Sequence, residues 1–144
     1  MDFPTALGGG SGMRSTEPNT TTATPLDLIN ASWKTANDAY QQKQYGAALI
    51  ALDKIATIDP NFELENRGDY FFKKGLVQLK MDKFADAIAS FEAVTEGDYI
   101  ANAQWKRALT LLKTNPAEAK KALTAIVNSP HPEKVTAAEI LKDL

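Results

Sequence analysis

The residues able to carry out chemistry are few in this sequence, and their spacing does not support catalysis. The 144 residues include no cysteine and a single histidine, His131. This histidine lies between Pro130 and Pro132, so it is expected in a loop, where it caps a helix or faces solvent. A thiol nucleophile and thiolate metal sites are excluded, and no histidine is placed to activate a serine. The sequence therefore predicts a protein that is not an enzyme and that uses no cofactor or metal.

Two other patterns resemble functional motifs but have simpler explanations. The glycines at positions 8–10 are not followed by the Lys-Ser/Thr pair of a phosphate-binding loop, and no predicted strand precedes them. The acid pair of Asp82 and Asp86 fits the solvated start of a helix. What remains as a candidate for function is a surface, and the hydrophobic pattern indicates which elements build it.

Composition narrows the partners of that surface. With a formal net charge of −2, the chain has no broad basic surface for nucleic acid or an anionic membrane. No apolar run approaches the roughly 18 residues that span a bilayer, so direct membrane contact is not expected. The first residues lack the basic start and apolar block of a secretory signal. A protein or a peptide remains as the expected partner.

Residues 1–23 differ in composition from the rest of the chain. Positions 8–12 read Gly-Gly-Gly-Ser-Gly, a flexible-linker sequence that looks engineered, and residues 14–23 are rich in threonine with almost no apolar content. Such a stretch cannot offset its ordering entropy by burying surface. We expect a flexible leader or linker over residues 1–23 and one folded domain over residues 24–144.

Seven segments of this domain have the hydrophobic period of a helix, and none alternates as a strand would. The first follows Thr24-Pro25-Leu26-Asp27, a cap, a proline and an acid in the order typical of a helix start. The second runs from residue 45 to the break at residues 59–60. The third and fourth are expected over residues 65–81 and 84–95, and Asp98 is expected to cap the fifth. Asn115-Pro116 opens the sixth, and the last is expected over residues 132–144.

A glycine in the middle of the third segment indicates close packing of two helices. Gly75 costs about 1 kcal/mol relative to alanine in a helix, which suggests that a neighbouring helix leaves no room for a side chain. Ala87 and Phe91 in the fourth segment are four residues apart, so they share one face. With the large residue Phe71 also in place, the pattern predicts two antiparallel helices that nest together.

This pattern resembles the tetratricopeptide repeat (TPR), whose period is 34 residues. An alanine followed four residues later by a large residue recurs three times, as Ala48/Leu52, Ala87/Phe91 and Ala119/Leu123. Three aromatic residues precede these pairs at spacings of 38 and 34 residues: Trp33, Phe71 and Trp105. In this alignment the position of Gly75 is taken by Asn37 and by Leu109, and the first and third turns are shorter than in the family.

The resemblance covers residues 27–128 and implies an all-α fold. It would be a right-handed α-solenoid of three TPR-like helical hairpins plus a C-terminal capping helix with a polar outer face. A non-repetitive helical bundle is the alternative. The closing segment, residues 103–141, looks like the TPR regions of bacterial envelope proteins, which favours the periplasm or cell envelope over the cytoplasm.

In TPR proteins the first helix of each hairpin lines a concave groove. Carried over by position, the resemblance places nine residues there: Lys34, Asp38 and Gln41, then Phe72, Leu76 and Leu79, then Lys106, Thr110 and Lys113. Basic edges around an apolar centre would suit an extended peptide with an acidic end. The alternative is that Phe72, Leu76 and Leu79 belong to the core. The resemblance does not extend to the charged clamp of chaperone-binding TPR domains. Asp38 and Leu76 occupy the positions at which such a clamp has asparagine.

Two functions follow from the resemblance. The first is a non-catalytic scaffold for protein–protein interaction that binds a partner polypeptide in the concave groove. The alternative is a structural or oligomerising soluble segment of a larger, membrane-anchored bacterial envelope protein. An ordinary leader is the first interpretation of residues 1–12. The alternative hypothesis is that Phe3 and Leu7 dock on the Phe72/Leu76/Leu79 surface of the same chain or of a neighbouring molecule, because the residues between them and the domain form a short tether.

Overall fold

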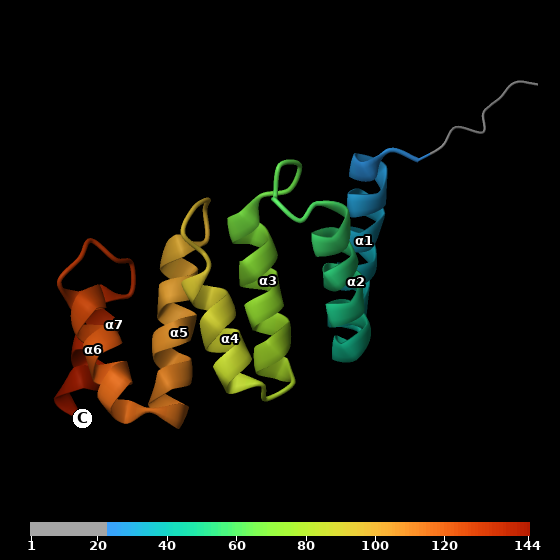
Figure 1. Ribbon diagram of the computed structural model, residues 1–144. Helices are drawn as coiled ribbons and strands as arrows, with labels where there is room; N and C mark the ends of the chain where they lie inside the picture. Colours follow the sequence, from blue (N-terminus) through green and yellow to red (C-terminus); the bar gives the residue numbers. More distant parts are fainter. Residues whose placement is uncertain (1–22) are drawn as a thin grey trace, which may run out of the picture.

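The computed structural model describes residues 23–144, and this part of the chain folds into seven α-helices with no strand. The helices are α1 (Pro25–Gln41), α2 (Tyr45–Ile58), α3 (Arg67–Lys80), α4 (Phe84–Glu92), α5 (Ile100–Thr114), α6 (Pro116–Val127) and α7 (Lys134–Lys142). They pair as three hairpins, α1–α2, α3–α4 and α5–α6, which stand in a row with α7 against the last (Figure 1). The predicted all-α helical repeat is confirmed. The predicted docking of Phe3 and Leu7 concerns residues outside the described range.

Local capping explains where α1 and α3 begin. The Thr24 hydroxyl accepts a hydrogen bond from the Asp27 amide, and the Asp27 carboxylate accepts one from the Thr24 amide, both at 3.1 Å. The predicted start of α1 is therefore confirmed. α3 begins at residue 67 instead of 65, because the Asn66 side chain caps it by accepting from the Asp69 amide at 3.0 Å.

The later helix ends differ from the prediction. Asp98 does not cap α5; the residue before the helix is Tyr99, which makes no side-chain cap hydrogen bond. α4 ends at Glu92, three residues early, and the chain leaves it through a loop in which Gly97 has a φ of 87°. α7 is shorter than expected at both ends, since residues 131–133 form a turn and residues 143–144 follow the helix.

The first two hairpins repeat each other at a constant offset of 39 residues, the separation of Lys43 and Asp82. Both residues lie in the turn between paired helices and adopt left-handed backbone, with φ of 62° and 58°. The amides that follow them make equivalent hydrogen bonds: Gln44 to the Ala39 carbonyl at 2.8 Å, and Lys83 to the Gln78 carbonyl at 2.9 Å. The turns match residue by residue, so the helices that they join must match as well.

This offset corrects the predicted alignment of the first repeat by one residue. It matches Gly75 with Ala36 and not with Asn37. Ala36 is fully buried, as a close contact between paired helices requires, whereas Asn37 is exposed. The first turn is therefore as long as the second, and the prediction that it is shorter was wrong.

The third hairpin keeps the small position but has a shorter turn, as predicted. Ala108 is fully buried and takes the place that the prediction assigned to Leu109. α5 ends at Thr114 and α6 begins at Pro116, so Asn115 alone joins the two helices. The register error is thus the same in the first and third hairpins, and it comes from aligning on the aromatic residues.

The aromatic residues that are equivalent in the three hairpins lie three positions before the small residues. They are Trp33, Phe72 and Trp105. Phe71, which was predicted to occupy this position, packs instead between the first and second hairpins. Its ring lies 5.6 Å from that of Phe62 and 5.0 Å from that of Tyr70, centroid to centroid.

Within each hairpin the small residue lies opposite a large one on the partner helix. A Cβ atom added at Gly75 would lie 2.5 Å from Cε1 of Phe91, closer than non-bonded atoms approach. The aligned pairs are Ala36 with Leu52 and Ala108 with Leu123, and each pair shares one core cluster. The hairpin with the largest residue thus has the smallest one opposite, and the predicted nesting of α3 and α4 is confirmed.

His131 is buried, not solvated, and fastens the loop before α7 to α5. Its exposed fraction is 9%. Nε2 lies 2.9 Å from the Ala101 carbonyl oxygen, and Nδ1 accepts a hydrogen bond from the Glu133 amide at 2.9 Å. The neutral tautomer with the proton on Nε2 satisfies both contacts. The predicted solvated position was therefore wrong. His131 does not cap the first turn of α7, which has no side-chain cap hydrogen bond; it binds the amide of Glu133, the residue just before the helix.

We expect Gly75→Ala to lower the free energy of unfolding by about 1–2 kcal/mol, because overpacking against Phe91 outweighs the better helix propensity of alanine. Adding Phe91→Leu recreates the Ala36/Leu52 pair, so the double variant should lose less than the two single variants added together. Urea unfolding of the four proteins measures this coupling. Strictly additive losses would contradict the proposed fit between the two positions.

We expect His131→Leu to destabilise the protein by roughly 1–3 kcal/mol, because the substitution leaves the Ala101 carbonyl and the Glu133 amide without their partner. His131→Asn should lose less, since the asparagine oxygen can replace Nδ1 as the acceptor for the Glu133 amide. Chemical denaturation compares the two variants. Equal stability of His131→Leu and wild type would show that neither hydrogen bond contributes.

Candidate functional site

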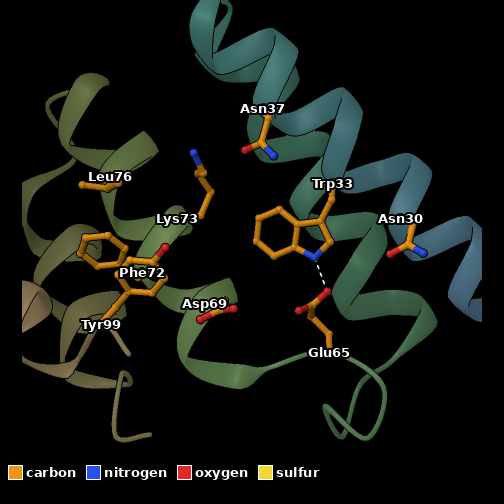
Figure 2. A pocket seen from close by; sticks show the side chains of 9 residues that line it. All are labelled: Asn30, Trp33, Asn37, Glu65, Asp69, Phe72, Lys73, Leu76 and Tyr99. Atoms are coloured by element: carbon orange, nitrogen blue, oxygen red, sulfur yellow. Dashed lines mark hydrogen bonds between the residues drawn. The ribbon is translucent and has the colours of Figure 1, made fainter. Parts of the chain in front are cut away.

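A groove of about 520 Å³ lies between α1 and α3, on the side where Tyr99 leads into α5. We call it the α1–α3 groove (Figure 2). It is lined by Asn30, Trp33, Asn37, Glu65, Asp69, Phe72, Lys73, Leu76 and Tyr99. These side chains combine aromatic surface, carboxamides and charges of both signs in one concavity, as in sites that recognise a ligand by shape and hydrogen bonding.

The apolar wall of the groove comes from the second hairpin and the loop before α5. Phe72 and Tyr99 stack in parallel, with ring centroids 4.7 Å apart and an interplanar angle of 7°. Behind them Phe72 contacts Phe91, at a centroid distance of 6.0 Å. Because Phe91 is held against Gly75, the nested packing of α3 and α4 sets the position of this wall.

Trp33 forms the opposite wall, and a hydrogen bond fixes its ring. Its indole Nε1–H donates to the Glu65 carboxylate (Figure 2). Glu65 belongs to the loop between α2 and α3, 32 residues along the chain. The orientation of the indole therefore depends on how firmly this loop is held.

Asp59 holds the loop that carries Glu65. It is buried, with an exposed fraction of 4%. Its carboxylate accepts hydrogen bonds from the backbone amides of Glu63 and Leu64 at 2.9 Å and of Glu65 at 2.8 Å. Burial raises the pKa of Asp59, but these three bonds to the charged form outweigh it and hold the pKa below its usual range.

Charged side chains of opposite sign lie one helical turn apart on α3. Burial raises the pKa of Asp69, and the nearby negative charge of Asp98 raises it further. Burial lowers the pKa of Lys73, whose Nζ lies 4.6 Å from the centroid of the Tyr40 ring. In Figure 2 Asp69 lies toward the Glu65 end of the groove, and Lys73 extends toward Asn37. Both charges are partly desolvated, so each favours a ligand group of opposite sign.

The residues predicted for the first hairpin lie beside the groove instead of lining it. Lys34 and Asp38 form a surface ion pair at 2.8 Å, and Gln41 is exposed at the end of α1. The one-residue correction explains the shift, because each residue turns a helix by about 100°. The residues that line the groove from α1 are Asn30, Trp33 and Asn37.

The residues predicted for the third hairpin do not join this groove either. Thr110 is buried, and its hydroxyl donates to the Lys106 carbonyl at 2.7 Å. Lys106 is half-buried. Lys113 is exposed, and its Nζ lies 5.6 Å from the centroid of the Phe84 ring. Whether any of these residues contacts a ligand stays a prediction.

The three residues predicted for the second hairpin divide between the two alternatives. Phe72 and Leu76 line the groove, and they also pack against the core cluster of Ala87 and Phe91. Leu79 packs against the same cluster but does not line the groove. Leu79 thus has a core contact only, and Phe72 and Leu76 have both a core contact and a position in the groove. Whether any of the three contacts a ligand stays a prediction.

Sequence reasoning missed all of the polar residues that line the groove. Asn30 and Asn37 would have followed from aligning Ala36 with Gly75, the one signal that was present in the sequence. Glu65 and Tyr99 lie in connections between hairpins, where helical periodicity says nothing about direction. Lys73 lies one residue after Phe72 and was not expected to reach the groove.

Residues 23–144 hold neither a membrane-spanning helix nor a cluster of metal-ligating side chains. No helix in this range has the length and apolar character needed to cross a membrane. In the same part of the chain no three His, Cys, Asp or Glu side chains gather as they would around a metal ion.

Comparison with known proteins bears on the fold. No protein-family model matches the sequence, and no curated protein gives a significant match. Among solved structures, the chain resembles the N-terminal domain of stress-induced protein-1 (STI-1) from C. elegans. The TM-score is 0.68 with 24% sequence identity, over 84% of this chain and 99% of that one. The likeness establishes a TPR-like helical repeat fold.

We expect Asp59→Asn to lower the melting temperature at pH 7, because an amide replaces a carboxylate that accepts three backbone hydrogen bonds. The lowered pKa of Asp59 means that its contribution is complete above the unfolded value of about 4 and is lost as pH falls through the folded value. The difference in melting temperature between the wild type and Asp59→Asn should therefore become smaller toward pH 3. Thermal melts at both pH values measure it, and an unchanged difference would contradict the assignment.

Proposed function

We propose that this protein is a non-catalytic scaffold for protein–protein interaction that binds a partner polypeptide in the α1–α3 groove. The observation that carries the proposal is the composition of this groove: aromatic walls on two sides, carboxamides on α1, and one partly buried charge of each sign on α3. A TPR-like fold supports the same function, since stacked helical hairpins create extended concave binding surfaces.

An extended peptide fits the groove through one apolar side chain and its own backbone. Trp33 on one wall and the Phe72–Tyr99 stack on the other offer rigid aromatic surface, which binds at low cost in conformational entropy. Asn30 and Asn37 are exposed on α1 and each can donate and accept hydrogen bonds. Their carboxamides can satisfy the amides and carbonyls of a ligand that has no secondary structure of its own.

The charges favour a basic residue beside the apolar anchor. Asp69 and Asp98 repel each other, and a ligand cation between them would relieve that repulsion. Lys73 already interacts with the Tyr40 ring, and Lys34 is paired with Asp38. The acidic peptide end expected from the sequence loses its main support, because the lysines thought to receive it lie outside the groove.

The sequence also allowed a structural or oligomerising segment of a larger envelope protein. The exposed apolar face of the first hairpin, which includes Leu28 and Ile50, favours self-association. A periplasmic or envelope setting stays a prediction, which neither the fold nor the comparisons test.

A peptide-display selection on the whole protein tests the function. We expect enriched peptides to share an aromatic or aliphatic residue next to lysine or arginine. Asn37→Arg should lower the affinity for the selected peptides at least about tenfold, because the long cationic side chain occupies the groove and repels a basic ligand. Asn37 is exposed, so the variant should keep the wild-type melting temperature.

Ala125→Arg serves as the matched control, since it adds the same side chain at an exposed position on α6. Its peptide affinities should equal those of the wild type. If no peptide is enriched, or if both arginine variants bind the enriched peptides equally well, the α1–α3 groove is not the binding site. Fluorescence polarisation with labelled peptides measures the affinities.

A further inference from the structure

The first hairpin exposes a second concave surface, separate from the α1–α3 groove. It encloses about 730 Å³ between α1 and α2, on the side away from α3, and shares no lining residue with that groove. Leu28, Ala31, Ala47, Ile50 and Ile58 give it a largely apolar character. Ile50 is 64% exposed and Leu28 is 47% exposed. Large apolar residues gathered on one exposed face are typical of an interaction site.

The repeat shows what this face does elsewhere in the molecule. At the offset of 39 residues, Ala31 on α1 corresponds to Tyr70 on α3. Tyr70 is 2% exposed and packs into the core cluster of the first hairpin. The first helix of the second hairpin thus uses this face to pack on the hairpin before it. Within residues 23–144 no hairpin precedes α1, so the equivalent face is left uncovered (Figure 1).

The most exposed large apolar residue of the face, Ile50, differs from its repeat partner. Ile50 aligns with Ala89 in the second hairpin, and both positions are exposed. A solenoid normally ends in a polar face, which keeps the array from associating. The other end is more polar, because α7 exposes Lys134, Glu139 and Lys142 beside one large apolar residue, Val135. The N-terminal end of the row lacks such a polar face.

We propose that a second copy of this chain covers this face, with α1 and α2 of one copy packed on α1 and α2 of the other about a two-fold axis. A two-fold contact requires a self-complementary surface. Asp53 and Lys54 line the concavity as neighbours of opposite charge, so the axis can place Asp53 of each copy near Lys54 of the other. A face with one charge sign would repel its own copy.

The size of the face is sufficient for such a dimer. α1 has 17 residues and α2 has 14, which at about 1.5 Å per residue makes them roughly 25 and 20 Å long. Two helices side by side, each about 10 Å wide, present a surface on the order of 500 Å² per copy. Two copies then bury about 1,000 Å², which is near the lower limit for a specific interface. A reversible dimer is the expected result.

A head-to-tail assembly fits less well. It would set the charged outer side of α7 from one copy against the apolar face of the next, and it would leave charges buried without partners. A head-to-tail contact forms a ring only where its rotation closes, and it produces filaments otherwise. The closed two-fold arrangement covers the apolar face on both copies at once.

Sedimentation equilibrium of the full chain, from micromolar to millimolar concentration, tests the proposal. We expect reversible association from a monomer of 15.7 kDa to twice that mass. Ile50→Glu should weaken the dimer at least about tenfold without loss of helix content, because the side chain is exposed in the monomer. Val135→Glu is the matched control: it removes an apolar residue that is 73% exposed on α7 and should leave the dimer intact.

A charge exchange tests the two-fold axis itself. Asp53→Lys alone should weaken the dimer, and adding Lys54→Asp should restore it, because the pair is then complementary again in the opposite order. Methyl signals of Ile50 in nuclear magnetic resonance should shift on dilution. A protein that is monomeric at every concentration, or a dimer that survives Ile50→Glu, overturns the proposal. So would Ile50 signals that show a covered side chain at every concentration, since this would assign the face to another segment of the same chain.

Discussion

The close approach of paired helices is the constraint on which the rest of this structure depends. In each hairpin one position must carry almost no side chain, because a large residue of the partner helix occupies the space: Phe91 against Gly75 in the second hairpin. Ala36 and Ala108 are fully buried at the aligned positions. When one residue is held at this contact, the rotation of the whole helix about its axis is set, since successive side chains are about 100° apart around that axis. The contact therefore decides which side chains face the groove.

The groove is assembled by contacts that extend outward from this packing. Gly75 seats Phe91, Phe91 supports Phe72, and Phe72 stacks on Tyr99. The opposite wall depends on a polar route, in which the Asp59 carboxylate holds the loop and Glu65 accepts from the Trp33 indole. One wall is thus set by apolar contact and the other by hydrogen bonds to a buried acid. Low pH weakens only the wall that contains Trp33, because the Asp59 carboxylate must be ionised to hold the loop.

The hairpins share a plan but are not interchangeable. Gln78 and Ser90 form a buried hydrogen bond of 2.6 Å between α3 and α4. The aligned residues of the first hairpin are Ala39 and Ala51, which are also buried. A buried polar group needs a polar partner. If α3 packed on α2 in place of α4, Gln78 would face Ala51 and would lose its hydrogen bond. The two ends of the row differ as well, with an apolar face at α1 and a charged one at α7.

The sequence by itself determined the helices, because capping, helical period and chain-breaking residues act within a few positions. Thr24 with Asp27, and Asn115 with Pro116, begin α1 and α6 where the pattern predicts, and Gly75 marks the close contact of α3 with α4. Only the tertiary structure decided the register of one hairpin against another. Ala36 and Asn37 are both compatible with a helix, and only the partner helix decides which of the two positions must be small. The same holds for His131 and Glu65, whose partners lie about 30 residues away along the chain. Local rules place such residues in loops, but direction and burial arise from packing between distant segments.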